Sequence, residues 1–208
     1  MAVSADAGAI ALAMTGASGA CYGLRLLEQL LKAGRPVSLM LSRPAQVVIG
    51  METDLRLPGR PAGIRAYLTA HFGCAAGQLQ VYGKEEWTAP VASGSAAAPA
   101  MVVCPCTTAT LAAIAGGTCD NLIHRAADVS IKEGRKLILV VRETPFSAIH
   151  LENMLKLARL GAVILPANPG FYHRPATVAE LVDFIVARVL DHLGVANTLS
   201  PRWGTEAR

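Results

Sequence analysis

The sequence is short of aromatic residues, has no run of like charges and has no long apolar stretch. Only 5% of its residues are aromatic and 16% are charged, with a formal net charge of +4. Because Lys and Arg are not clustered, this small positive excess favours anionic small molecules over nucleic acid as ligands. No apolar stretch reaches the roughly 20 residues needed to cross a bilayer, so we expect no membrane span.

The chain also lacks a cysteine framework. Its five cysteines are odd in number and have no recognisable spacing, and Cys104-Pro105-Cys106 is not a CxxC motif. We therefore expect a reducing, cytoplasmic setting, buried thiols and no metal centre. Residues 1–8 lack the basic and apolar regions of a signal peptide, and we expect them to form a flexible N-terminus.

What is present is a high apolar content in an alternating pattern. The 208 residues are 52% hydrophobic, enough for one domain, 1–208, with a sizeable core. Apolar runs alternate with helical patterns, which predicts an α/β, three-layer fold with a doubly wound, mostly parallel sheet. We expect strands at 9–14, 37–41, 79–82, 101–104, 136–141 and 162–165. The low-complexity segment 87–100 is long for a compact domain, so we expect it to be disordered or a functional lid.

Small and hydroxyl residues follow two of these runs. Thr15-Gly16-Ala17-Ser18-Gly19 lies between the first expected strand and a helical pattern, a context that suits phosphate binding. The spacing is not that of the dinucleotide motif, so a tight turn without a ligand remains an equal alternative. After the fourth strand, hydroxyl residues including Thr107 and Thr110 either cap a helix or hold a phosphate there.

Charged and aromatic residues follow the other strands. Arg142 and Glu143 come directly after the fifth strand, and Tyr172 lies in a Pro-rich loop after the sixth. Ser42 ends the second strand and Glu52 follows a little later. Because the carboxyl ends of parallel strands border one crevice, these groups predict a site for a phosphorylated ligand.

Three cations on expected helices are less informative. Arg125 and Lys132 are seven residues apart and share a helix face, which is usually a solvated face. Arg188 borders an apolar arc and needs an anionic partner, either protein or ligand. His150 and His173 are candidates for acid or base catalysis, but a single His is more often structural.

The sequence resembles the flavin prenyltransferases, the UbiX family, formerly described as aromatic acid decarboxylases. The resemblance runs from residue 9 to the PRWG tail. It is carried by MTGASGACYGLRLLEQL, CPCTTATLAAIAGGTCDNLIHRAADVSIKEGRKL, VRETPFSAIHLENMLKLARLGAVILPANPGFYHRP and LVDFIVARVLDHLG. It implies a flavodoxin-like Rossmann fold that binds FMN.

The resemblance also implies an activity and partners. Enzymes of this family join a dimethylallyl group, usually from dimethylallyl phosphate, to N5 and C6 of reduced FMN without a metal. The prenylated FMN serves a UbiD-type decarboxylase, and ubiquinone synthesis is one such setting. The family forms homo-oligomers, commonly dodecamers, with sites at subunit interfaces.

Carried over residue by residue, the resemblance implies three overlapping groups. Proton transfer at N5 would involve Glu52, and the catalytic residues would be Ser18, Glu52, Lys132 and Glu143. The donor would be bound by Arg125, Lys132, Arg142, Tyr172 and Arg188, with Trp203 of a docked tail, 194–208, closing the site. The FMN contacts would be Gly16, Ala17, Ser18, Ser42, Thr107, Thr108, Ala109, Thr110 and Arg142. Thr107 stands where the family usually has Ser.

Other activities remain as alternatives. One is a flavin-dependent cysteine decarboxylase of the phosphopantothenoylcysteine type, although the sequence lacks that enzyme's His segment. A second is direct decarboxylation of an aromatic acid. A third is an FMN-binding electron carrier without turnover, which would have no need of a second phosphate site such as that implied for Lys132, Tyr172 and Arg188.

Overall fold

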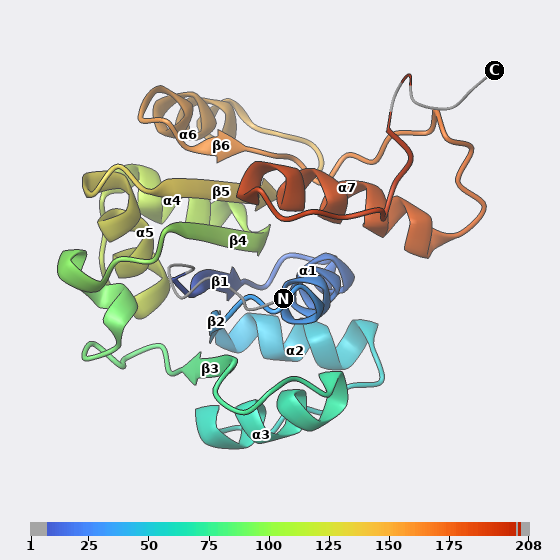
Figure 1. The fold of residues 1–208 in the computed structure, drawn as a ribbon. Coiled ribbons are helices and arrows are strands. Elements are labelled where there is room, and N and C mark those ends of the chain that lie inside the picture. Colours follow the sequence, from blue (N-terminus) through green and yellow to red (C-terminus); the bar gives the residue numbers. More distant parts are fainter. Residues whose placement is uncertain (1–7, 203, 205–208) are drawn as a thin grey trace.

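A computed structural model describes residues 8–202 and 204 of the chain. The core of the fold is a parallel sheet of six strands in the order β3-β2-β1-β4-β5-β6 (Figure 1). The strands are β1 (Ile10–Met14), β2 (Val37–Leu41), β3 (Leu79–Tyr82), β4 (Ala100–Cys106), β5 (Lys136–Val141) and β6 (Val163–Ile164). β1, β2 and β4 are buried throughout, as expected for parallel strands covered on both faces.

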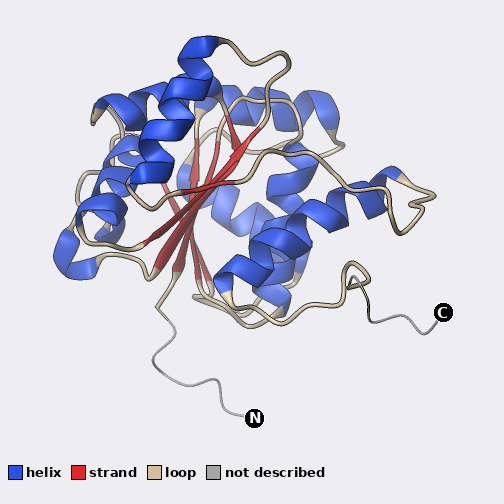
Figure 2. Cartoon of the chain, turned by 90° about the horizontal axis from the view of Figure 1, so that it is seen from above, coloured by secondary structure: helices blue, strands red, loops and turns tan. Residues whose placement is uncertain are grey.

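Helices cover both faces of this sheet, which gives the predicted three layers (Figure 2). One face carries α1 (Ala20–Lys32), α2 (Arg43–Glu52), α3 (Pro61–Phe72) and α7 (Val178–Leu193). The other carries α4 (Thr108–Gly116), α5 (Leu122–Lys132) and α6 (Ala148–Arg159). No helix in the described part of the chain is long and apolar enough to cross a membrane.

The order of the strands reverses between β1 and β4. From β1 the chain builds outward through β2 to β3, and it then returns to add β4, β5 and β6 on the other side. Loops after β1 and β4 diverge to opposite faces, so they leave a crevice at their carboxyl ends. The Gly-rich turn predicted from the sequence follows β1, and the predicted Thr-rich helix start follows β4.

Side-chain caps fix where several helices begin at this edge. Ser42 Oγ accepts the N–H of Ala45 at the start of α2, and Thr107 Oγ1 accepts the N–H of Thr110 at the start of α4. The side-chain oxygen of Asn121 caps α5 in the same way by accepting the N–H of His124. Such caps satisfy amides that have no partner within the helix.

The expectation of disorder at 87–100 is wrong, and the alternative of a functional lid stays a prediction. The chain forms two short 3-10 turns there, η1 (Pro90–Ala92) and η2 (Gly94–Ala96). Val91 is buried in the core beneath α5, and Arg125 Nε donates to the carbonyl oxygen of Ala92 at 3.0 Å. Apolar anchoring and this hydrogen bond give the segment a fixed place, which its composition did not reveal.

The chain after α7 turns back onto the end of that helix. Asp191 forms an ion pair with Arg202 at 2.8 Å and accepts a hydrogen bond from Asn197 at 3.2 Å. Partial burial acts to raise the pKa of Asp191, but the hydrogen bonds from Arg202 and Asn197, with the charges of Arg202 and Arg188, lower it overall. Residues 1–7 and Trp203 lie outside the described residues, so the calls for a flexible N-terminus and for Trp203 are not placed.

Candidate functional site

The turn after β1 is held close to α2. A Cβ atom on Gly16 would lie 2.3 Å from Cβ of Pro44, so only glycine fits at this position. Arg142, just past β5, donates from Nε to the carbonyl oxygen of Ser18 at 3.0 Å. The turn of Gly16, Ala17 and Ser18 is therefore clamped from both sides of the crevice.

Glu52 occupies the N-terminus of α1. Its carboxylate accepts the N–H of Gly19 at 2.9 Å and the N–H of Ala20 at 2.8 Å. Partial burial acts to raise its pKa, but hydrogen bonds from Ser18, Ala20 and Gly19, with the charge of Arg142, lower the pKa overall. The amides of Gly19 and Ala20, where the sequence predicted an anion, therefore already bind the carboxylate of Glu52. A phosphate would not find free amides there, so this turn is better suited to contact the edge of a flavin ring.

A second carboxylate lies across the crevice. Glu143 Oε2 accepts a hydrogen bond from Thr108 Oγ1 at 3.5 Å, and Glu143 Oε1 accepts the N–H of Thr144 at 3.0 Å. Together with Arg142 it joins the end of β5 to the first turn of α4. The structure therefore brings Ser18, Glu52, Arg142, Glu143 and Thr108 to one edge of the sheet, as predicted.

Thr15 ties the two loops of the switch point together. Its buried hydroxyl donates to the carbonyl oxygen of Pro105 at 2.8 Å and accepts the N–H of Thr107 at 2.8 Å. Thr107 Oγ1 donates in turn to Thr110 Oγ1 at 3.0 Å, so the hydroxyl hydrogen of Thr110 remains available to another acceptor. The predicted cap is therefore confirmed, and it leaves Thr110 able to bind an anion, which stays a prediction.

A pocket of about 240 Å³ opens beside these hydroxyls. We call it the phosphate pocket, because cations, hydroxyls and an amide gather around it. Its lining residues are Thr15, Ser42, Arg43, Pro44, Lys84, Thr110, Asn121, Ile123 and His124. Within the described residues, Arg43 makes no hydrogen bond or ion pair. Two cations and fixed hydroxyls suit a phosphate monoester.

Four polar residues of this pocket were missed in the sequence: Arg43, Lys84, Asn121 and His124. Arg43 follows Ser42 at the end of β2, and Lys84 comes two residues after the end of β3. Inspecting the residues that follow every expected strand, including the edge strand β3, would have identified Arg43 and Lys84. Asn121 caps α5, and His124 contacts both Asn121 and Asp120, with 2.5 Å between Nδ1 and the Asp120 carboxylate.

Lys132 lies far from this edge. α5 begins where the N–H of Leu122 donates to the carbonyl oxygen of Lys84, and it ends at Lys132, four residues before β5 starts. Eleven helical residues span about 16 Å, so Lys132 lies toward the opposite edge of the sheet. There its ammonium pairs with Glu133. On the same helix, Arg125 forms an ion pair with Asp128 at 2.9 Å.

Arg188 is also remote, and on the other face of the sheet. The last turn of α7 lies beside the start of β5, where Lys136 donates to the carbonyl oxygen of His192. Arg188 pairs with Asp191 at 3.0 Å, so its anionic partner within the chain is a protein carboxylate. Because α5 and α7 pack on opposite faces, Lys132 and Arg188 of one chain do not meet.

Tyr172 lies on the long connection between β6 and α7. This connection extends away from the sheet, on the opposite side of the molecule from α5 (Figures 1 and 2). The side chain of Tyr172 is 81% exposed. Among the described residues of one chain, the predicted donor-binding side chains therefore fall into separate places, and Arg142 is the one at the crevice.

The two histidines considered as acid or base candidates, His150 and His173, have partners within the protein. His150 completes a capping box with Ser147, and His173 stacks on Phe184, so both have structural roles.

Burial raises the pKa of Cys106 to about 12 and that of Cys104 further. The expectation of buried thiols is confirmed for these two cysteines and is wrong for Cys21 and Cys119, which are exposed. No group of three His, Cys, Asp or Glu within residues 8–202 and 204 is placed to hold a metal ion.

This fold and crevice define a flavin-binding α/β protein, and comparison with known proteins agrees. The model of the Flavoprotein family matches residues 4–190. Flavin prenyltransferase UbiX of Pseudomonas aeruginosa is 59% identical over 95% of this chain and 94% of its own length. The UbiX of Alkalihalophilus pseudofirmus is 46% identical over 92% and 94%. The chain belongs to the flavoprotein family and, within it, to the UbiX flavin prenyltransferases.

Solved structures support the same family. AnUbiX, in complex with FMN and dimethylallyl pyrophosphate, superposes with a TM-score of 0.84 at 41% identity, over 96% of this chain and 99% of that one. A dodecameric FMN-dependent UbiX-like decarboxylase from Escherichia coli O157:H7 gives 0.81 at 40% identity, over 93% and 98%. The predicted flavodoxin-like fold is confirmed. A phosphopantothenoylcysteine-type (PPC) decarboxylase, at 17% identity, shares the fold alone.

Proposed function

We propose that this chain transfers a dimethylallyl group from dimethylallyl phosphate to N5 and C6 of reduced FMN. The observation that carries the proposal is the crevice at the β1/β4 switch point, where a phosphate pocket lies beside a clamped Gly-rich turn. The FMN phosphate would bind to Ser42, Thr110, Arg43 and Lys84, and the flavin edge would lie against Gly16, Ala17 and Ser18. Thr107, Thr108 and Ala109 form the adjoining wall.

The reaction breaks the allylic C–O bond and releases inorganic phosphate. The flavin gains one prenyl unit and loses one proton, so no oxidant is consumed. Fixed cations stabilise the phosphate that departs, and in a preorganised site they do so without reorganisation. Arg142 is the predicted donor-binding cation that lies at the crevice, and Glu143, the next residue, would help to order the cations of the donor site.

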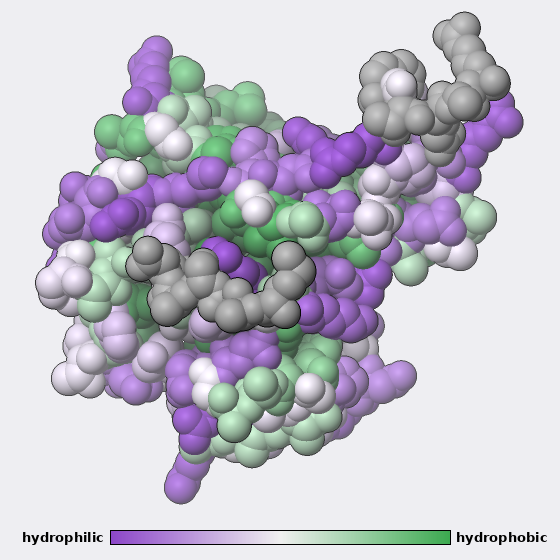
Figure 3. All heavy atoms as spheres, viewed as in Figure 1, coloured by the Kyte–Doolittle hydropathy of each residue, from purple (hydrophilic) through white to green (hydrophobic). Residues whose placement is uncertain are grey.

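The other cations of the donor site would come from neighbouring subunits. Lys132 and Arg188 lie on opposite faces of one chain, so a site that contains both must be built from more than one chain. Large apolar residues are exposed on α6 and at the start of α7, among them Ile149, Leu155 and Val178. Figure 3 shows hydrophobic side chains gathered over α6 at the upper left. Such patches are typical of subunit interfaces.

We therefore propose a homo-oligomer, as in the dodecameric relative, with Arg125, Lys132, Tyr172 and Arg188 reaching sites that they share with other subunits. Trp203 and the tail 194–208 are proposed to close such a site. The product would be passed to a UbiD-type decarboxylase, and ubiquinone synthesis is the proposed setting, in the cytoplasm and without a metal.

The direct test is a change in flavin mass. Mixing the protein anaerobically with reduced FMN and dimethylallyl phosphate is expected to yield a flavin heavier by one prenyl unit, measured by mass spectrometry of the extracted cofactor. Omitting the phosphate ester is the control. An FMN mass that stays unchanged, with FMN demonstrably bound, would favour an electron carrier.

The phosphate pocket gives a separate prediction. Replacing both cations, Arg43→Ser with Lys84→Ser, should weaken FMN binding about 10- to 100-fold, because a hydrogen bond to a charged group contributes roughly 1.5–3 kcal/mol. Riboflavin, which lacks the phosphate, should bind as before. Fluorescence titration measures both. Lys32→Ser with Arg159→Ser removes the same charge elsewhere and is expected to change neither; equal losses for FMN and riboflavin would contradict the assignment.

A further inference from the structure

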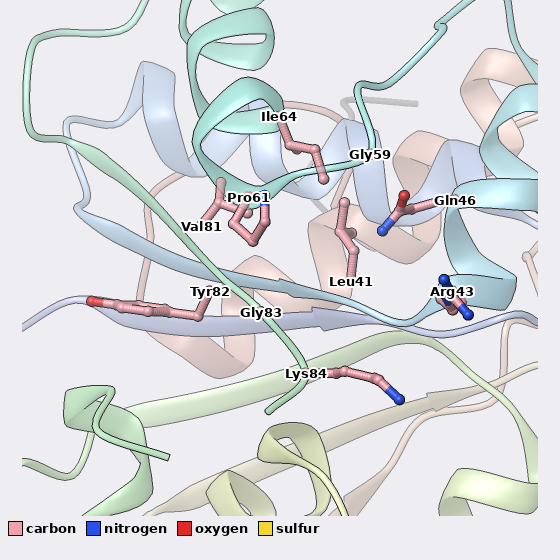
Figure 4. A pocket seen from close by; sticks show the side chains of 10 residues that line it. All are labelled: Leu41, Arg43, Gln46, Gly59, Pro61, Ile64, Val81, Tyr82, Gly83 and Lys84. Atoms are coloured by element: carbon pink, nitrogen blue, oxygen red, sulfur yellow. The ribbon is translucent and has the colours of Figure 1, made fainter. Parts of the chain in front are cut away.

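A second pocket, of about 320 Å³, lies next to the phosphate pocket. It is enclosed by the ends of β2 and β3 and by α2 and α3 (Figure 4). Its lining residues are Leu41, Arg43, Gln46, Gly59, Pro61, Ile64, Val81, Tyr82, Gly83 and Lys84. Its volume lies within the range of about 300–1,000 Å³ found for small-molecule sites. Apart from Arg43 and Lys84, which are proposed above to bind the FMN phosphate, no residue assigned to the prenyl transfer lines it.

The wall of this pocket is apolar on one side. Leu41, Ile64 and Val81 are buried core residues, and Pro61 stands beside them at the start of α3. Figure 4 shows the amide of Gln46 directed from α2 toward Leu41, across the pocket. A carboxamide offers a donor and an acceptor side by side, the pattern that pairs with the N6/N7 edge of adenine. An apolar slot with one amide therefore suits a purine base.

The two pockets share both of their cations. Arg43 and Lys84 line the phosphate pocket and this one, and Figure 4 shows the two side chains on the same side of the second pocket. A group lying between the pockets would contact a guanidinium and an ammonium together. A pyrophosphate has the charge and the oxygen atoms that such a pair binds best.

The order of these environments follows the order of groups in a flavin dinucleotide. The Gly-rich turn for the flavin edge is followed by the phosphate pocket, then by Arg43 and Lys84, and then by the apolar slot with Gln46. We propose that the second pocket binds an adenine nucleotide moiety, so that the protein accepts FAD as well as FMN. This rests on the proposed position of the FMN phosphate.

A larger side chain can be introduced at the lining of this pocket without steric conflict. A Cβ atom on Gly59 meets no atom within 4 Å and its backbone is not in the left-handed region, so Gly59→Leu places a side chain at the pocket wall without strain. Gly50, on α2, is equally unobstructed and lies outside the pocket lining, which makes Gly50→Leu the matched control. Gln46→Leu removes the amide and serves as a second variant.

The experiment is a titration of the full-length protein with FMN, FAD and, on FMN-saturated protein, 5′-AMP. The wild type is expected to bind FAD with a Kd within about tenfold of that for FMN. Gly59→Leu and Gln46→Leu should each raise the Kd for FAD by about tenfold or more and leave that for FMN unchanged, whereas Gly50→Leu changes neither. Flavin fluorescence reports the first two ligands and calorimetry the third.

The outcomes distinguish FAD from a separate adenine nucleotide as the ligand, and they distinguish failure of this inference from failure of the proposed function. FAD binding that is sensitive to Gly59→Leu supports the dinucleotide, and AMP binding beside FMN with the same sensitivity supports a separate nucleotide. Wild-type protein that binds FMN but neither FAD nor AMP overturns this inference and leaves the FMN site intact. FAD binding that is indifferent to both variants also overturns it. Failure to bind FMN itself would instead contradict the proposed function.

Discussion

Lys132→Ala is expected to abolish prenyl transfer while leaving FMN bound. Lys132 lies about 16 Å along α5 from the phosphate pocket of its own chain, so its loss does not disturb that pocket. In the oligomer its ammonium is proposed to face the donor phosphate of another subunit, where a fixed cation stabilises the leaving group. Loss of one such contact commonly lowers turnover about 100- to 1,000-fold. Turnover and FMN affinity, measured side by side, check both halves of the prediction.

The separation of Lys132 from Arg142 makes a stricter test possible. Arg142 lies at the crevice of its own chain, so Lys132→Ala and Arg142→Ala inactivate a shared site through different subunits. When the two inactive variants are unfolded together and reassembled one to one, about a quarter of sites should receive both wild-type residues. Activity should therefore return to about a quarter of that of the wild type. Mixtures that stay inactive would show that both residues serve from one chain.

Arg188→Ala extends the same reasoning to the other face. Its ion pair with Asp191 is surface-exposed, and Arg202 also pairs with Asp191, so the stability of the fold should change by less than about 1 kcal/mol. Prenyl transfer should nevertheless be lost. Thermal unfolding separates the two effects. A large fall in melting temperature with turnover retained per folded molecule would assign Arg188 a structural role only.

The sequence was most informative where local rules apply. Buried apolar strands, small residues after β1 and hydroxyl residues after β4 predicted the sheet and the edge that carries the site. These features depend on neighbours within a few residues, which a sequence displays directly. The crevice then followed from the rules for parallel sheets, whereas the order of the strands was not predicted.

Contacts between distant segments were not predictable in this way. The carboxylate of Glu52 lies on the amides of Gly19 and Ala20, more than thirty residues away in sequence, and no local pattern announces this. The segment 87–100 looked unstructured because its composition is simple, yet Val91 and the carbonyl oxygen of Ala92 hold it against α5. The family resemblance named Lys132 and Arg188, but only the fold shows that they lie on opposite faces.

Glu52→Gln is expected to lower turnover about 100-fold or more, with little effect on FMN affinity. The amide oxygen of glutamine still accepts the N–H groups of Gly19 and Ala20, so the start of α1 keeps its cap. What is lost is the negative charge and the ability to take a proton beside the flavin, and a positioned base contributes roughly 10²- to 10⁴-fold. Glu28→Gln, on α1 but outside the crevice, is the matched control.

The pH dependence of wild-type turnover gives a second test of the role assigned to Glu52. Hydrogen bonds and the charge of Arg142 outweigh partial burial and lower the pKa of Glu52 below its usual value, so the carboxylate stays ionised at neutral pH. The contribution of Glu52 to stability is therefore present above the pKa of an unfolded glutamate and is lost as the pH falls through the lowered value. The pH profile of turnover should therefore show no change caused by Glu52 near neutral pH, and the decline caused by protonation of Glu52 should appear only at acidic pH. Full turnover of Glu52→Gln at neutral pH would remove Glu52 from the chemistry and leave it as the cap of α1.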